Sequence, residues 1–430
     1  MRLSIVVLCY IFCCIDCKSE QNVRLLSPLI FVPGCGGNQL EAQLSKPSAV
    51  HFWCWQNSDD FYRIWLDSAQ IIPGLIDCWV DNMKLSYDNV THTTNNSPGV
   101  KIRAPGWGSV DGMEFIDPTP VVDVYDYGYY FYHIITALTA NGYDRQKNMY
   151  GAPYDFRKGP NENKGWFQQV QHLTESAYKN NDRQRVTFIA HSMGGLMVLQ
   201  FLQQMTSAWK ETYVKQMITL SVPWGGSIQA LQAVSVGYDF NSPILINSKM
   251  KEVQETCPSL VWLLPSTYFW KPNEILVSTK NKQYRMENLG EFFNAINNPY
   301  INDIRRDLSI FNNFSAPGVE VHCLYGKNMG DTAESLDFYN GLNSYPTITY
   351  GDGDGTVNLR SLLGCTYWRN TSAQEKHSVY QQAFPNVEHY NLLGDSRVIN
   401  YIINRLITSA DGAAKWYQKS HPINNMIRFF

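Results

Sequence analysis

The stretch RVTFIAHSMGGLMVLQFLQQM, residues 185–205, decides the fold of this chain. Its first part, 185–190, is a short apolar run that predicts a buried strand, and 196–205 has the apolar spacing of a helix. The turn between them carries Ser192, with Ala190 and Gly194 two positions to either side. A serine on a tight strand-to-helix turn is the pattern of a nucleophile elbow, whose small neighbours avoid clashes. The alternative is a serine that only caps the helix.

Further apolar runs and helical stretches alternate along the chain. Strands are expected at 28–32, 214–222 and 319–325, and helices at 130–140 and 165–179. Alternation of this kind predicts a mostly parallel sheet covered by helices on both faces. With the elbow, it predicts an α/β-hydrolase fold, with a core formed by 25–47, 126–224 and 316–410. Insertions rich in Trp, Asn, Pro and Ser are expected at 48–85, 86–125 and 225–315, the last two as cap or lid insertions over the sheet, and 411–430 is expected to be a tail.

In this fold an acid and then a histidine follow the serine. The turn GDGDGTV at 351–357 offers Asp352 and Asp354, and we select Asp354. The same turn could be a calcium loop, but the glutamate of an EF-hand is missing. Of the three later histidines, His389 precedes a helical run, whereas His377 lies in a charged stretch and His421 in the tail. The hypothesis is that Asp354 orients His389, which takes the proton of Ser192.

An acyl-transfer site also needs two donors for the oxyanion. One is expected from the backbone N–H of Met193, and the other from the loop PGCGGN at 33–38, which contains Cys35. Its glycines would allow backbone amides to approach a substrate, although the loop could also be an ordinary tight turn. No second base accompanies Cys35, so we interpret it as a free thiol beside the site.

Composition narrows the class of protein. The 430 residues are 44% hydrophobic and carry a net charge of −3, so a large core is possible and a nucleic-acid partner is not expected. No residue pattern calls for a metal or another cofactor. The chain is expected to be a monomer.

The N-terminus and the cysteines indicate the compartment. Residues 1–18 read as a cleaved signal peptide, because the apolar run is too short to span a membrane. Six of the ten cysteines lie beyond it, and some should form disulfides. Glycosylation sequons, which fit a lumenal or secreted chain, occur at Asn89, Asn95, Asn313 and Asn370.

Longer motifs make the chain resemble the lecithin:cholesterol acyltransferase family, and in particular its lysosomal phospholipase branch. The resemblance spans about residues 25–408. The matching stretches are VPGCGGNQLEAQL at 32–44, IDCWVDN at 76–82, GAPYDFRK at 151–158, PNEN at 160–163, AHSMG at 190–194, PWGG at 223–226, HCLYG at 322–326 and GDGDGTVN at 351–358.

The resemblance implies roles for individual residues. It assigns Ser192, Asp354 and His389 to the family's triad, and Met193 and Cys35 to its oxyanion donors. It implies disulfides between Cys54 and Cys78 and between Cys323 and Cys365, which leaves Cys257 unpaired. It makes 48–85 a membrane-docking insertion, with Trp65, Ile71, Ile72, Leu75 and Ile76 as docking residues. Gln229 replaces a lysine that the lysosomal enzymes carry near the lipid phosphate.

The expected function is a serine-dependent phospholipase A and lipid O-acyltransferase that forms an acyl-Ser192 intermediate. Water or a lipid alcohol such as ceramide would accept the acyl group at the surface of a phospholipid membrane. The alternatives are a secreted lecithin:cholesterol acyltransferase, a neutral-lipid lipase, and a lipid-binding protein without activity. The expected location is the lysosome lumen or the extracellular space.

Overall fold

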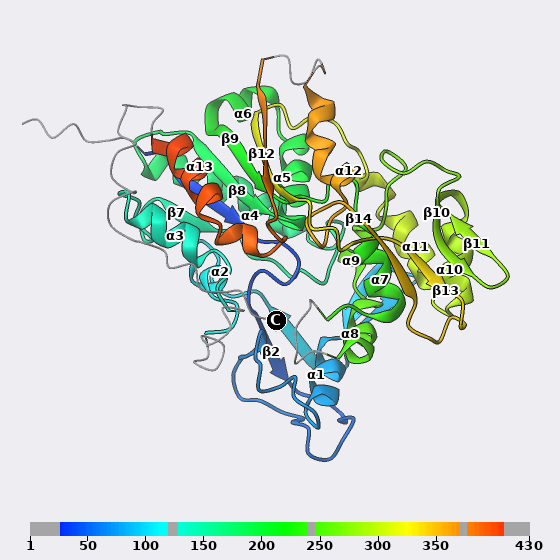
Figure 1. The fold of residues 1–430 in the computed structure, drawn as a ribbon. Helices are drawn as coiled ribbons and strands as arrows, with labels where there is room; N and C mark the ends of the chain where they lie inside the picture. The colour runs from blue at the N-terminus through cyan, green and yellow to red at the C-terminus, as the bar shows by residue number, and fades with distance from the viewer. Residues whose placement is uncertain (1–25, 119–127, 240–245, 370, 372–375, 408–430) are drawn as a thin grey trace, which may run out of the picture.

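A computed structural model describes residues 26–118, 128–239, 246–369, 371 and 376–407 (Figure 1). The expected signal peptide at 1–18, the tail at 411–430, His421 and Asn370 lie outside these residues. Within the described ranges, no helix is long and apolar enough to cross a membrane.

The centre of the molecule is a six-stranded parallel sheet with the order β15-β12-β9-β8-β1-β7. Its strands are β1 (Leu29–Val32), β7 (Met149–Gly151), β8 (Val186–His191), β9 (Val214–Leu220), β12 (Glu320–Lys327) and β15 (Val379–Pro385). All six positions of β8 are buried, as a strand covered on both faces requires. The predicted α/β-hydrolase fold is confirmed.

Helices cover both faces of this sheet (Figure 1). Leu29 and Phe31 of β1 pack on one side with α3 (Tyr132–Thr139) and α13 (Ser396–Ile407). Ile30 and Val32 point the other way, toward the core that includes α4 (Lys164–Asn180) and α5 (Met193–Gln204). This alternation follows from the two-residue period of a strand.

The insertion after β1 forms a small body beside the sheet, which Figure 1 draws around β2 and α1. It contains the antiparallel sheet β3-β2-β6, helix α1 and the hairpin β4-β5. Their bounds are β2 (Leu40–Leu44), β3 (Tyr62–Trp65), α1 (Ile76–Met83), β4 (Leu85–Asp88), β5 (Thr93–Asn96) and β6 (Val100–Arg103).

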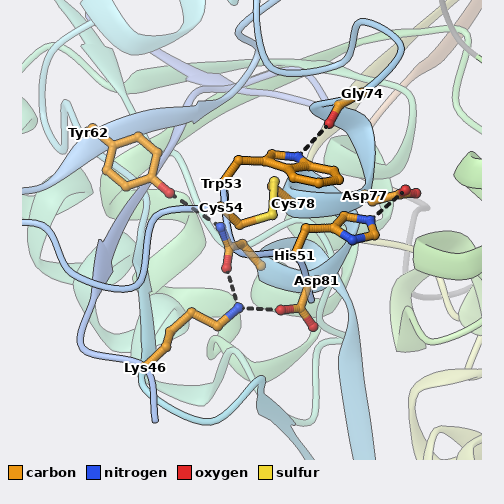
Figure 2. The surroundings of a disulfide bond; sticks show 10 residues. Lys46, His51, Trp53, Cys54, Tyr62, Gly74, Asp77, Cys78 and Asp81 are labelled. Atoms are coloured by element: carbon orange, nitrogen blue, oxygen red, sulfur yellow. Dashed lines mark hydrogen bonds and ion pairs between the residues drawn. A yellow bond between two sulfur atoms is a disulfide. The ribbon is translucent and has the colours of Figure 1, made fainter. Parts of the chain in front are cut away.

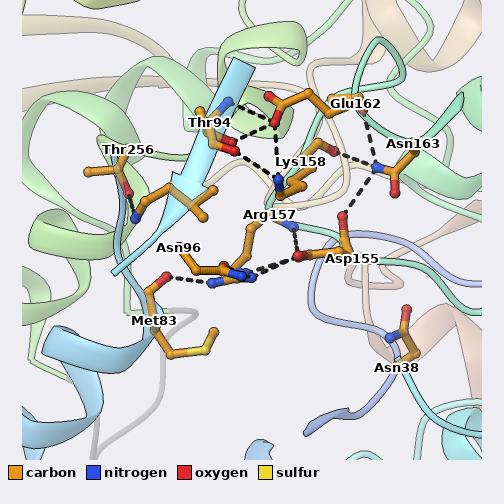
Figure 3. Close-up of polar contacts among 12 residues, drawn as sticks. Asn38, Met83, Thr94, Asn96, Asp155, Arg157, Lys158, Glu162, Asn163 and Thr256 are labelled. Atoms are coloured by element: carbon orange, nitrogen blue, oxygen red, sulfur yellow. Dashed lines mark hydrogen bonds and ion pairs between the residues drawn. The ribbon is translucent and has the colours of Figure 1, made fainter. Parts of the chain in front are cut away.

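A buried arginine connects this body to the core (Figure 3). Arg157, only 1% exposed, pairs with Asp155 at 2.7 Å and donates to Met83 O at the end of α1 and to Asn96 Oδ1 on β5. Burial pushes the pKa of Asp155 upward, but the Arg157 guanidinium outweighs it and holds that pKa below the ordinary value. Beside it, Glu162 accepts from the N–H and hydroxyl of Thr94. Polar bonds therefore fix the insertion to the loop after β7.

A second sheet, β11-β10-β13-β14, lies on the other flank of the molecule. Its strands are β10 (Ile275–Thr279), β11 (Gln283–Arg285), β13 (Thr332–Phe338) and β14 (Thr347–Gly351), and the helices around it are α7 (Ile228–Val236), α8 (Asn247–Gln254), α9 (Pro258–Trp262), α10 (Leu289–Ala295) and α11 (Tyr300–Asp307). Strand β13, in the range 316–410 expected to belong to the core, pairs in parallel with β10 of the expected insertion 225–315.

Candidate active site

Ser192 lies at the turn from β8 into α5. Its φ of 54° is in the left-handed region, which a non-glycine residue rarely adopts, and its N–H donates to Leu220 O at 2.9 Å. The turn requires a small residue at position 194, since a Cβ there would lie 2.4 Å from Val32 O. This strained, close-packed turn has the geometry of a nucleophile elbow.

Three residues that are far apart in the sequence meet at this turn. The Ser192 hydroxyl lies 3.0 Å from His389 Nε2, and His389 Nδ1 lies 2.8 Å from Asp354 Oδ2. The other carboxylate oxygen of Asp354 accepts from the N–H groups of Thr356 and Val357. Asp354 is fully buried and His389 is 8% exposed. The arrangement can deprotonate the serine and hold the resulting imidazolium.

Burial lowers the pKa of His389, but the Asp354 carboxylate outweighs it, and Glu388 adds to the same effect, so the pKa lies above the ordinary 6.5. A raised pKa makes His389 a stronger base once it is neutral. It also means that acid protonates His389 and removes its capacity to accept a proton.

The rejected candidates lie elsewhere. Asp352 accepts from the N–H of Asn328 at 2.6 Å, and His389 pairs with Asp354 instead. His377 is half-buried next to β15, and burial lowers its pKa. Within the described ranges, no cluster of His, Cys, Asp and Glu side chains could hold a metal ion.

The two expected oxyanion donors belong to segments that lie next to Ser192. Met193 is the first residue of α5, where a helix leaves N–H groups without an internal partner. The loop that carries Cys35 touches the nucleophile, since a Cβ on Gly34 would lie 2.6 Å from Ser192 Cβ. Burial raises the pKa of the Cys35 thiol to about 12, so the thiol is neutral and a poor nucleophile.

The structure contains the two disulfides that the resemblance implies. Cys54 and Cys78 join the two ends of the docking insertion, and Cys323 on β12 is bonded to Cys365. Cys257 is a buried free thiol.

The expected docking residues divide into two groups. Ile72 and Leu75 are 46% and 40% exposed, whereas Trp65, Ile71 and Ile76 belong to the core. For these three the expectation of an exposed side chain was wrong. Trp65 donates to Gly36 O at 2.8 Å and packs on Trp79, so it holds the loop that carries Cys35.

Sequence reasoning missed a second group of exposed apolar residues in the same insertion. Phe52, Trp53 and Trp55 are 93%, 48% and 68% exposed. Figure 2 shows how the two groups meet, because the Cys54–Cys78 disulfide and the bond from Trp53 Nε1 to Gly74 O hold the segments together. The signal was available in the run HFWCW at 51–55, whose aromatic residues surround the half-cystine. The six large apolar side chains in residues 48–85 that are exposed are called the apolar tip below: Val50, Phe52, Trp53, Trp55, Ile72 and Leu75.

The structure also locates the glycosylation sequons and Gln229. The sequon residues Asn89, Asn95 and Asn313 are exposed. Gln229 is 7% exposed and donates to Gln232 Oε1 at 2.8 Å, and Gln232 in turn donates to Tyr345. A lysine at position 229 would therefore disturb a buried amide pair.

Comparison with known proteins found sequence relatives along most of the chain. The family model described as "Lecithin:cholesterol acyltransferase" matches residues 61–313 and 300–396. The "Lysosomal phospholipase A and acyltransferase" of Bos taurus is 37% identical over 87% of this chain and 90% of its own length. The human protein of that name is 35% identical over 87% and 89%. The "Phosphatidylcholine-sterol acyltransferase" of Gallus gallus is 35% identical over 85% and 87%. A solved Tle4-Tli4 complex has a TM-score of 0.47 and 13% identity, covering 87% of this chain and 96% of the matched one.

Proposed function

The chain belongs to the lecithin:cholesterol acyltransferase family, and from this premise we propose that it is a phospholipase A and lipid O-acyltransferase. Ser192, His389 and Asp354 act as its catalytic triad. The contact of Ser192 with His389, itself oriented by Asp354, carries this proposal. The relatives named for phospholipase and acyltransferase activity support the substrate class.

The first half of the reaction forms the acyl-enzyme. Ser192 Oγ attacks the acyl carbonyl of a glycerophospholipid while its proton passes to His389 Nε2. The N–H groups of Met193 and Cys35 stabilise the oxyanion. When the intermediate collapses, the C–O bond to the glycerol breaks, and His389 returns the proton to the leaving oxygen of the lysophospholipid.

The second half transfers the acyl group. His389 takes a proton from water or from a lipid alcohol, whose oxygen attacks the acyl carbonyl. The ester bond to Ser192 breaks, and the serine recovers its proton from His389. The product is a fatty acid or a new ester, and the acceptor present decides between them because both share one intermediate.

The apolar tip supports action at a membrane surface. Aromatic and aliphatic side chains that stay exposed although an extensive core is available indicate a surface that contacts lipid. Full burial of one such side chain is worth about 1.5–3 kcal/mol, so a few inserted residues can hold the protein reversibly. The Cys54–Cys78 disulfide keeps the two exposed segments together. The enzyme acts in the lysosome lumen or outside the cell, as its relatives' names and the expected signal peptide suggest.

One experiment tests the activity and identifies the acceptor. The purified protein is incubated with phosphatidylcholine vesicles that contain either ceramide or cholesterol, and the products are identified by mass spectrometry. Released fatty acid together with acylceramide supports the proposal, whereas cholesteryl ester as the main product favours the sterol acyltransferase alternative. A protein that binds the vesicles, forms neither product and does not react with a fluorophosphonate probe is a lipid-binding protein without activity.

A further inference from the structure

A chain of buried hydrogen bonds runs behind the triad. The N–H of Gly34 donates to Tyr130 Oη at 2.9 Å, and Tyr130 Oη lies 2.5 Å from His191 Nδ1. On its other side, His191 Nε2 lies 3.2 Å from the backbone oxygen of His389. Tyr130 is 3% exposed and His191 is 2% exposed. The chain therefore connects the loop of the expected oxyanion donor to the residue that carries the base.

The proton of each of these hydrogen bonds can be assigned to one donor atom. Tyr130 has a single O–H and already accepts from Gly34, so its proton goes to His191 Nδ1. His191 Nδ1 is then an acceptor, and His191 Nε2–H donates to the carbonyl of His389. The ring must be neutral for this arrangement. Burial, and then the neighbouring His389, hold the pKa of His191 well below its ordinary value, which keeps the ring neutral.

The glycines of the loop fit around Tyr130. A Cβ on Gly37 would lie 2.3 Å from Tyr130 Cζ, so only glycine allows the ring to enter. Gly34 O accepts from the N–H of Gly37 at 3.1 Å. The N–H of Cys35 belongs to the same planar peptide as Gly34 O and points the opposite way, away from the turn. Holding Gly34 at both its N–H and its C=O therefore sets the direction of the Cys35 donor.

We propose that Tyr130 and His191 are positioning residues that hold the oxyanion loop and the His389 backbone in register for acyl transfer. The inference rests on the proposed function. It assigns a task to the histidine that directly precedes the nucleophile and to a tyrosine that the sequence analysis did not select. Because preorganised donors act mainly on the transition state, the loss should appear in kcat rather than in KM.

The test uses hydrolysis of a soluble short-chain ester. Tyr130→Phe keeps the ring and removes the hydroxyl, and kcat should fall about 10–100-fold with KM little changed, which is less than the loss of a whole oxyanion donor. The matched control is Tyr325→Phe, because Tyr325 is also buried and its hydroxyl accepts from Gln381 instead of from the oxyanion loop. A kcat for Tyr130→Phe equal to that of the control overturns the proposal.

A second pair of variants separates positioning from a purely structural role. Glutamine at position 191 can accept from Tyr130 and donate to the His389 carbonyl, so His191→Gln should keep most of the activity that His191→Leu loses. Equal kcat values for these two variants, both folded by thermal melting, overturn the proposal. Labelling of Ser192 in the wild type by a fluorophosphonate is measured alongside. If the wild type is neither labelled by the fluorophosphonate nor active on the ester, the result contradicts the proposed function instead of the positioning role of Tyr130 and His191.

A separate observation concerns a cavity of about 320 Å³ between α5, the loop after β9 and the segment that ends α11. Apolar and aromatic side chains form much of its wall, including Trp224, Tyr268 and Phe314, and Arg305 adds a positive charge. Arg306 also lines the cavity, but it is exposed and its charge is paired with Asp303 at 2.9 Å. Arg305 is half-buried, and among the residues that the structure describes it has no ion pair. Burial lowers its pKa, so a bound anion would compensate its charge.

We infer that this cavity binds the anion of a fatty acid, with the carboxylate on Arg305 and the chain against the aromatic wall. The combination of the half-buried Arg305, which has no ion pair within the described residues, with an apolar wall matches a single-chain anionic lipid, which is the product of the proposed hydrolysis. The inference therefore rests on the proposed function for the source of the ligand.

Equilibrium dialysis with labelled oleate, below its micelle concentration, tests the site. Arg305→Gln should weaken oleate binding at least 10-fold and leave oleyl alcohol binding unchanged, because only the carboxylate needs the cation. Arg397→Gln is the control, because Arg397 is an exposed arginine that pairs with Asp395 at 2.7 Å and does not line the cavity, and it should bind both lipids as the wild type does. Equal oleate binding by Arg305→Gln and the wild type overturns the inference, as does the absence of saturable binding in the wild type. Phospholipid hydrolysis by the same preparation shows separately whether the proposed function holds.

Discussion

His389 Nδ1 lies 2.8 Å from Asp354 Oδ2, and this contact joins the loop after β15 to the turn after β14. The backbone repeats the connection, because the N–H of His389 donates to Asp354 O at 2.8 Å. Two bonds between the same residues fix both the tautomer and the orientation of the imidazole. The pair therefore presents Nε2 to Ser192 as an acceptor, which is what a general base requires.

The first prediction concerns the choice of acid. Asp354→Asn should lower kcat by about 10⁴ while the fold is retained, because the amide cannot hold the base in the correct tautomer. Asp352→Asn removes a neighbouring carboxylate that bonds to Asn328 and should have nearly normal activity. Circular dichroism and hydrolysis of a soluble ester provide the measurement. The opposite order of the two variants would show that Asp352 is the catalytic acid.

The second prediction concerns pH. Burial lowers the pKa of His389, but Asp354 and Glu388 outweigh it, and the active form of the histidine is the neutral one. Activity on a soluble ester should therefore fall as the pH drops through a value above 6.5. Glu388→Gln removes one of the charges that raise this pKa, and the acid limb of kcat/KM should move to lower pH.

The matched control for this shift is Glu334→Gln, since Glu334 lies by Arg360 at 3.6 Å instead of by His389. Its acid limb should coincide with that of the wild type. An acid limb that stays in place in Glu388→Gln would contradict the electrostatic explanation.

The third prediction concerns the connection between the docking insertion and the core. Arg157→Met removes the fully buried guanidinium that pairs with the half-buried Asp155 and should lower the free energy of unfolding by about 3–5 kcal/mol. Arg103→Met breaks a pair with Glu41 whose arginine side chain is 56% exposed, and should cost about 0–1 kcal/mol. Urea unfolding measures both values. Similar losses in the two variants would show that the buried network does not stabilise the fold.

The fourth prediction concerns the apolar tip. Replacing Ile72 and Leu75 with serine should abolish vesicle binding, and replacing Phe52 and Trp55 should do the same. Neither pair belongs to the core, so thermal stability and soluble-ester hydrolysis should change little. Val90→Ser is the control, because Val90 is 82% exposed but lies in the β4-β5 turn outside the tip. Unfolding of either double variant, or vesicle binding at the level of the wild type, would contradict the docking role.

The sequence was most informative where local pattern and chemistry agree. The strand–turn–helix pattern around Ser192 predicted both a central strand and the position of the hydroxyl. Asp354 and His389 followed from the order serine, acid, histidine along the chain. The parallel sheet brings the loops after β8 and β15, with Ser192 and His389, to one edge, whereas Asp354 follows β14 of the second sheet.

Other features depended on contacts that no local pattern contains. Pro73 and Gly74 interrupt any periodicity in 71–76, so the sequence could not separate the buried Ile71 and Ile76 from the exposed Ile72 and Leu75. Strand β13 pairs with β10, which is separated from it by a long stretch of chain, and the sequence of neither strand indicates which strand it pairs with. The glycines at 34 and 37 were expected to let backbone amides approach a substrate. In the structure Ser192 packs closely on Gly34, and the ring of Tyr130 packs closely on Gly37.

The most direct test of the account is to trap the acyl-enzyme. The protein is incubated with a phosphatidylcholine of known acyl chains, quenched in acid and digested, and the peptide that contains Ser192 is examined by mass spectrometry. The account predicts that this peptide gains the mass of one acyl group, that the adduct disappears when water or a lipid alcohol is allowed to react, and that Ser192→Ala shows neither adduct nor turnover. An acyl group on another residue, or substantial turnover by Ser192→Ala, would contradict it.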